Sequence, residues 1–188
     1  MRTGLKSKDN RGFSLVELIV VIAILALMLG LFLLSSNILN VRAGKQCAKQ
    51  IKHELDQVRI STMGKNEVIM RLYLGTDGRV YVKETVTAPK IGDKGTQTYD
   101  EAEKQIGSKR ALVEIKVSGG SGFIALKEGG IRFKFNRATG AFEEIGDVTG
   151  DQPGVSAPYY IEEIKVTGGG QEHLLKLKKI TGKVEEVY

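Results

Sequence analysis

The sequence predicts an α+β protein in which one long N-terminal helix precedes a mostly antiparallel, β-rich head. An uncharged, largely aliphatic run covers Leu18 to Val41, and apolar residues then recur at helical spacing as far as Thr62. After residue 64 the pattern changes, because apolar and polar residues alternate as half-buried strands require, and all 3 prolines lie there. The 188 residues suit one ordinary domain plus an appendage.

The uncharged run is long enough to cross a bilayer. As a helix it spans about 36 Å at ~1.5 Å per residue, against a hydrocarbon core of roughly 30 Å. Half of the formal net charge of +6 lies in residues 1–12, ahead of this run. Lys and Arg before a membrane segment stay in the cytoplasm. We therefore expect a single pass through the cytoplasmic membrane, with the head outside.

Three interpretations of this membrane segment are possible: a secretory signal peptide, a permanent anchor and a specialised signal. The residues at the start of the run distinguish between them. The run is longer than that of a signal peptide, and the best later cleavage site, at residues 41–43, would interrupt the helix. Glu17 inside the start of a membrane helix is costly, although the helix dipole favours an acid there. The dipole does not explain the Gly12-Phe13 pair four residues earlier. Cleavage after Gly12 would leave an amine on Phe13, and this amine is the obvious partner for Glu17 of a neighbouring subunit.

The residues from Gly12 to Glu17, followed by the uncharged run, closely resemble the class III signal of type IV pilins and type II secretion pseudopilins. The resemblance implies that a prepilin peptidase cleaves between Gly12 and Phe13 and methylates the new N-terminus. It also implies that Glu17 is needed for filament assembly. The implied partners are other pilin or pseudopilin subunits and an inner-membrane assembly platform, with no cofactor and no small-molecule substrate. One departure is Leu34, where many pilins carry a helix-bending proline.

The resemblance and the composition divide the chain into four segments. Residues 1–12 form a cleaved basic leader, 13–36 the membrane and filament-core helix, 37–64 an amphipathic helical half, and 65–188 the head. The amphipathic half places one set of residues on its packing face, namely Val41, Gly44, Ala48, Ile51, Leu55, Val58 and Thr62. The opposite face carries Arg42, Lys45, Lys49, Lys52, Asp56 and Arg59. We interpret this basic face as solvated, with anionic lipid head groups or nucleic acid as alternative ligands.

The helix is expected from about Phe13 to about Met63, with Gly64 as its stop. Cys47 lies beside the packing face and is expected to be a buried free thiol, with an intermolecular disulfide as the alternative. A single cysteine excludes a disulfide framework within the chain.

Eight or nine short strands are expected in the head. Alternation places them around residues 70–74, 80–82, 113–117, 131–135, 164–166 and 175–177, before a closing hairpin that ends near 184. Residues 88–110 lack this pattern and are interpreted as a long loop with a helical turn around 99–106. Residues 146–158 are expected to form a second irregular loop. The segment 131–140 and the closing hairpin resemble those of H-type minor pseudopilins and FimT-type minor pilins.

No enzyme constellation is found in the sequence. His53 and His173 lack an evident nucleophile and are interpreted as surface or interface histidines. The glycines at 168–170 are not followed by a helix, so they form a turn and not a phosphate-binding loop. We therefore expect a non-enzymatic protein.

Two further sites are weaker candidates. Asp147 and Asp151 offer oxygens at the alternate positions that calcium loops use, although Gln152 stands where a glycine is needed. Major pseudopilins bind calcium in a C-terminal loop; the alternative here is a plain acidic turn. The C-terminal lysines Lys176, Lys178, Lys179 and Lys183 are candidate DNA contacts, but nearby glutamates reduce their net charge.

Two alternatives to a structural filament subunit follow. The first is a minor pilin whose head binds DNA or a surface in DNA uptake or adhesion. The second is a plain anchored domain with a coincidental motif.

Overall fold

The computed structural model describes residues 14–64, 66–89 and 95–187, with the side chains of 31–37 left out. The chain separates into two compact units, Met1–Asn37 and Ile38–Tyr188, and each is considered by itself. The expected leader, Gly12 and Phe13 lie outside the described residues.

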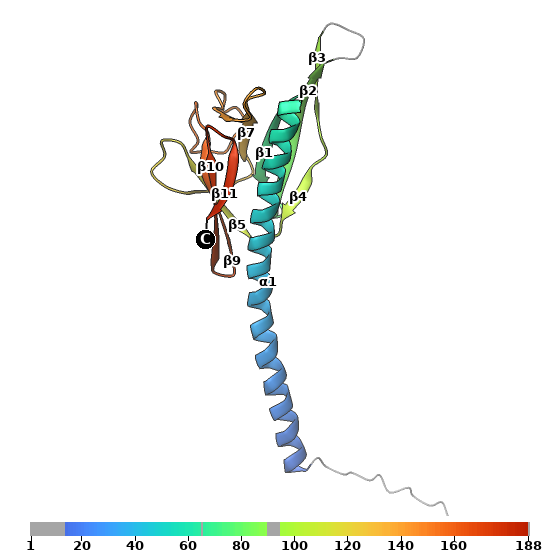
Figure 1. Ribbon diagram of the computed structural model, residues 1–188. Coiled ribbons are helices and arrows are strands. Elements are labelled where there is room, and N and C mark those ends of the chain that lie inside the picture. The colour runs from blue at the N-terminus through green and yellow to red at the C-terminus, as the bar shows by residue number, and fades with distance from the viewer. Residues whose placement is uncertain (1–13, 65, 90–94, 188) are drawn as a thin grey trace, which may run out of the picture. The chain divides into compact units, whose positions relative to one another are not determined.

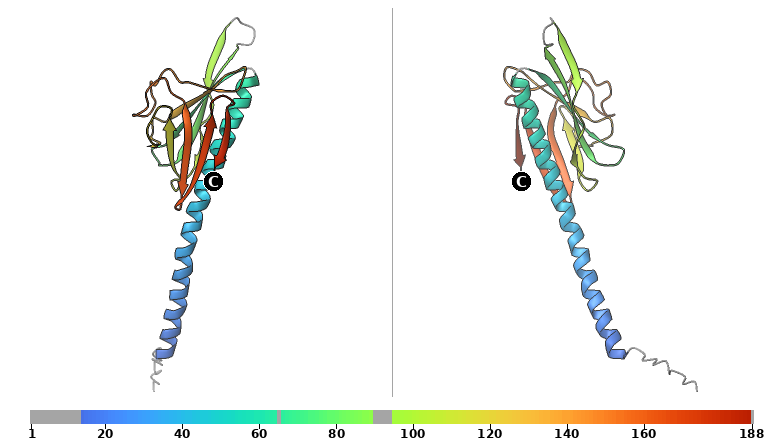
Figure 2. Two further views of the ribbon diagram at one scale, coloured as in Figure 1. Left: turned by 60° about the vertical axis from the view of Figure 1, so that its left-hand side comes forward. Right: turned by 90° about the vertical axis from the view of Figure 1, so that its right-hand side faces the viewer.

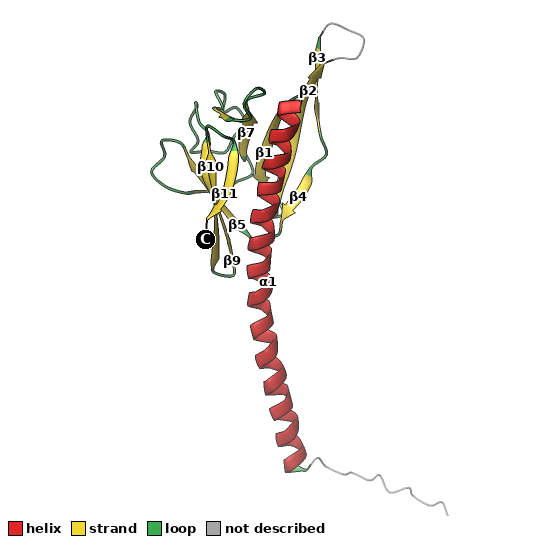
Figure 3. Ribbon diagram, in the orientation of Figure 1, coloured by secondary structure: helices red, strands yellow, loops and turns green. Residues whose placement is uncertain are grey.

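One helix, α1 (Leu15–Gly64), runs through 50 residues (Figure 3). Ser14 caps its N-terminus, because the Ser14 Oγ accepts a hydrogen bond from the Glu17 amide at 3.2 Å. The helix ends at Gly64, so the predicted helix is confirmed from Leu15 onward. In the part of the chain that the structure describes, no helix has the combined length and apolarity that crossing a membrane requires.

Eleven strands are described after the helix, and they form two antiparallel sheets (Figure 1). The first sheet has the order β3-β2-β1-β7-β8, and β4 also pairs with β2. Its strands are β1 (Glu67–Leu74), β2 (Val80–Pro89), β3 (Thr96–Asp100), β4 (Lys104–Gly107), β7 (Ile131–Phe135) and β8 (Phe142–Glu143). The second sheet has the order β11-β10-β9-β5-β6. Its strands are β5 (Leu112–Val117), β6 (Ile124–Ala125), β9 (Ile161–Gly168), β10 (Gln171–Lys178) and β11 (Lys183–Val187). The α+β class with antiparallel sheets is thereby confirmed.

A single hydrophobic core joins α1 residues of the second unit to both sheets. Figure 2 shows the C-terminal half of α1 lying beside the strands of this unit. The helix contributes Cys47, Ala48, Ile51, Leu55 and Val58, all buried. In the central strands β1, β7 and β9, the buried residues mostly alternate with partly exposed ones. The pleat of a strand places successive side chains on opposite faces, so one face of each strand packs into the same core. The Cys47 thiol is free as well as buried, as predicted, and burial raises its pKa to about 12.

The prediction for residues 88–110 is wrong. This segment holds the end of β2, all of β3 and all of β4, and its described part contains no helical turn. Every residue of β3 is exposed, so no alternation of polar and apolar residues marks this strand in the sequence. In β4 the one large apolar buried residue is Ile106. Residues 146–158 contain no strand of the sheets, as predicted, and only an isolated bridge, Ile145 to Tyr159, flanks them.

Close packing of backbone on backbone makes Gly44 a sensitive position in the second unit. A Cβ atom at Gly44 would lie 2.8 Å from the Gly168 amide nitrogen and 2.9 Å from its Cα. We expect Gly44→Ala to destabilise the head by about 1–3 kcal/mol, because overpacking outweighs the gain of roughly 1 kcal/mol in helix propensity. Gly64→Ala is the matched control, since a Cβ there meets nothing within 4 Å. Urea unfolding followed by circular dichroism measures both; equal stability of the two variants would contradict the prediction.

Candidate functional site

Glu17 lies in the first turn of α1. Ser14 and Glu17 have the spacing of a capping box, in which the serine oxygen accepts from the amide three residues later. The Glu17 side chain is exposed and makes no hydrogen bond or ion pair with the residues that the structure describes. An acid here is favoured by the helix dipole. Among the described residues, the carboxylate therefore has no partner, and it is able to accept a positive group.

The residues that surround Glu17 expose an unusual amount of apolar surface. From Leu15 to Leu29, every large apolar side chain is about half exposed or more, from 47% at Val21 to 74% at Leu15. Contiguous apolar surface of this extent marks contact with lipid or with another protein. This part of α1 is thus built to be covered by something other than its own subunit.

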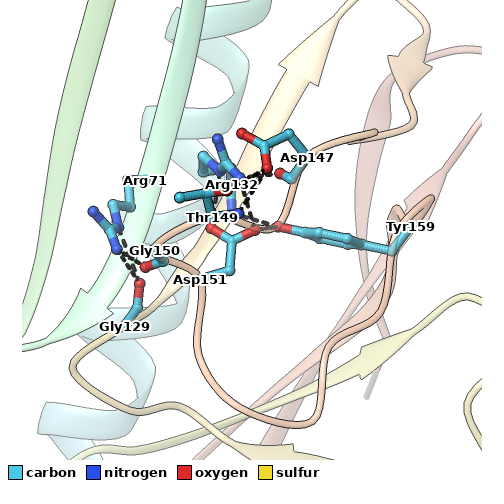
Figure 4. Close-up of polar contacts among 8 residues, drawn as sticks. All are labelled: Arg71, Gly129, Arg132, Asp147, Thr149, Gly150, Asp151 and Tyr159. Atoms are coloured by element: carbon cyan, nitrogen blue, oxygen red, sulfur yellow. Dashed lines mark hydrogen bonds and ion pairs between the residues drawn. The ribbon is translucent and has the colours of Figure 1, made fainter.

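The calcium candidate does not fit the arrangement of its residues. Asp151 is almost fully buried, and its Oδ1 accepts from the Arg132 Nε at 2.8 Å (Figure 4). Its Oδ2 accepts from the Tyr159 hydroxyl at 2.7 Å and from the Arg132 Nη2 at 3.1 Å. The Asp147 carboxylate accepts instead from the amide and hydroxyl of Thr149. No group of three or more His, Cys, Asp or Glu side chains in the described ranges is arranged to hold a metal ion.

The Arg132–Asp151 pair fastens the irregular loop 146–158 to the first sheet. The Arg132 guanidinium also donates to the Asp147 carbonyl oxygen. Burial by itself lowers the pKa of Arg132, but the hydrogen bond to Asp151 and the charge of that carboxylate outweigh this effect and raise the pKa. One strand away, Arg71 donates to the carbonyl oxygens of Gly129 and Gly150 (Figure 4). Arg132 and Asp151 lie far apart in the sequence. Only the fold therefore reveals that the acidic residues of the loop 146–158 hold the loop in place.

The C-terminal lysines are largely neutralised by glutamates. Lys179 lies 2.6 Å from Glu144, and Lys178 lies 3.4 Å from Glu185 across the β10–β11 hairpin. Lys176 lies 3.8 Å from Glu163 on β9. Of the four candidates, only Lys183 has no ion pair in the described structure. Such pairing leaves little uncompensated positive charge for a phosphate backbone.

The two histidines have different surroundings. His53 is exposed on α1, as predicted. His173 is buried on β10, which corrects the expectation of a surface or interface residue. Its Nδ1 lies 3.6 Å from the Glu186 Oε1, and neither of these two atoms has a hydrogen-bond partner among the described residues.

A comparison with protein families places a known motif on the N-terminal site. Residues 7–33 match the family described as the prokaryotic N-terminal methylation motif. This match supports a signal of the type IV pilin and pseudopilin type. It covers the predicted cleavage pair, Glu17 and all of the exposed apolar stretch from Leu15 to Leu29. No curated protein and no solved structure matches the chain significantly.

Proposed function

We propose that the chain is a structural pilin or pseudopilin subunit, assembled into a type IV pilus or a type II secretion pseudopilus after prepilin peptidase cleaves it between Gly12 and Phe13. The observation that carries the proposal is the methylation motif over residues 7–33. The free carboxylate of Glu17 and the exposed apolar surface around it support the same function. The protein acts as a building unit and not as an enzyme.

The apolar run serves two environments in turn. Before assembly, Leu18 to Val41 holds the subunit in the cytoplasmic membrane, with the basic leader inside and the head outside. An assembly platform in the membrane then extracts the subunit. In the filament the same apolar side chains pack against neighbouring helices, which cover the surface that lipid covered before.

Glu17 sets the register of that packing. The Phe13 amine that cleavage exposes is positively charged, and the Glu17 carboxylate of a neighbour is its partner. A buried carboxylate without a partner is strongly penalised in an apolar setting. Assembly in any other register would therefore leave a charge unpaired, so this single pair selects one arrangement.

Intact mass and N-terminal sequencing of the protein from native membranes test the proposal. With the prepilin peptidase present, we expect loss of residues 1–12 and a methylated Phe13 at the new N-terminus. Without the peptidase, the chain should begin at Met1. An uncut chain in both strains would identify a plain anchored domain and overturn the proposal.

A further inference from the structure

Four cations form a stripe on the outward face of α1 in the second unit. Arg42, Lys45, Lys49 and Lys52 follow one another at intervals of three or four residues, which places them on one side of a helix. The first three are exposed and Lys52 is half-buried. None of the four makes an ion pair or a hydrogen bond with a described residue. No described residue therefore compensates their charge.

An open cavity of about 210 Å³ on another side of α1 has the opposite charge. Glu54 of the helix, Glu84 of β2 and Glu101, which follows β3, line it together with a single cation, Lys104. Lys104 pairs with Glu54, which is only 3% exposed. Glu84 and Glu101 make no ion pair in the described structure. Burial, with the charges of Glu54 and Glu101 nearby, raises the pKa of the Glu84 carboxyl. The cavity thus has more negative charge than its own lysine offsets.

One subunit cannot bring its own stripe and cavity together. At 100° per residue, Glu54 lies roughly 140° around the helix from Lys49, so the two features face different directions. Two different patches that complement each other make a head-to-tail contact. Repetition of such a contact produces a ring or an open helical filament. A second copy of this chain therefore offers a surface that matches the stripe in charge.

We propose that the cationic stripe of one subunit binds the acidic cavity of a second copy of the chain, with Lys49 and Lys52 facing Glu84 and Glu101. The contact rests on the proposed function, because it deepens the account of how the subunits assemble. It joins α1 of one subunit to the cavity beside α1 of the other, at a distance along the chain from the pair at Glu17.

Cysteine cross-linking tests the contact directly. Two full-length chains are co-expressed with the assembly machinery, one with Lys49→Cys and the other with Glu101→Cys, and a short bismaleimide is added to membranes and to sheared filaments. We expect a cross-linked dimer in the mixed sample only. Lys49→Cys with Glu185→Cys is the control pair, since Glu185 is an exposed glutamate on β11. The single variants control for the native Cys47, which is fully buried. The proposal would be overturned if no cross-linked dimer formed, or if the control pair gave the same yield of dimer as the test pair.

Charge reversal supplies a second measurement. We expect Lys49→Glu to lower the amount of subunit in sheared filaments at least fivefold, and Glu101→Lys in the same chain to recover most of the loss. Lys127→Glu, an equal charge change at an exposed site, should have no effect. If Lys49→Glu weakened retention by anionic vesicles and left the amount of subunit in sheared filaments unchanged, the stripe would belong to lipid head groups and the proposal would fail. Absence of the wild-type chain from filaments would refute the proposed function instead, and the cross-link in membranes would still decide this inference.

Discussion

Replacement of Glu17 by alanine is expected to leave membrane insertion and cleavage intact and to abolish incorporation into the filament. Removal of the carboxylate makes the apolar segment more hydrophobic, so insertion should not suffer. The Glu17 amide keeps its hydrogen bond to Ser14, because the backbone donates it, so the start of α1 should persist. The Phe13 amine of the neighbour would lose its partner. We expect incorporation to fall at least a hundredfold, measured as subunit in sheared filaments relative to subunit in membranes.

Two companion variants separate charge from shape at this position. Glu17→Gln keeps the size and removes the charge, and should fail like Glu17→Ala. Ser14→Ala removes the N-cap and should cost about 1 kcal/mol of helix stability while it leaves incorporation largely intact. Normal incorporation of Glu17→Ala would show that the carboxylate is not needed for assembly, and the proposed role of Glu17 would be lost.

The helix and most strands can be predicted because their signals are local. The packing face named from the sequence is buried at Gly44, Ala48, Ile51, Leu55 and Val58, since helical period alone places these residues together. The alternation of apolar and polar residues locates strands β1, β5, β7, β9 and β10. It arises because one face of each strand meets the core and the other face meets solvent. β3 escapes prediction because all its residues are exposed, and its pairing with β2 depends on backbone hydrogen bonds that no side-chain pattern reports.

The candidate sites also divide into those that a local sequence signal reveals and those that only tertiary folding brings together. The spacing of Gly12, Phe13 and Glu17 is a local signal, so the sequence alone reveals it. The role of Ser14 as the helix cap emerges only in the structure, although its Ser-x-x-Glu spacing is a sequence signal for such a cap. The acidic cavity cannot be predicted, because its carboxylates come from a helix, a strand and a connecting segment that only tertiary folding brings together. The structural role of Asp151 is hidden from the sequence for the same reason, since its partner Arg132 lies 19 residues away.

Asp151→Ala is expected to destabilise the head by about 3–5 kcal/mol, the cost of leaving one member of a largely buried ion pair without its partner. Asp151 is about 1% exposed and Arg132 about 22%. The substitution would also leave the buried Tyr159 hydroxyl without its acceptor. The loop 146–158 would lose the side-chain carboxylate that fastens it to the first sheet. Thermal unfolding of the purified chain, followed by circular dichroism, measures the loss, and processing at Gly12 should be unchanged because the signal lies in the other unit.

Asp147→Ala is the matched control in the same loop. The contact of Arg132 with residue 147 uses the backbone carbonyl, so it survives the substitution. Hydrogen bonds from Thr149 lower the pKa of the Asp147 carboxyl. A lowered folded-state pKa contributes stability above the unfolded pKa, and this contribution disappears as the pH falls through the folded pKa. Both variants are therefore compared at neutral pH, where the Asp147 contribution is fully present and still small. Equal losses at the two positions would contradict the argument, because they would show that the loop is held by its turns and not by the buried Arg132–Asp151 pair.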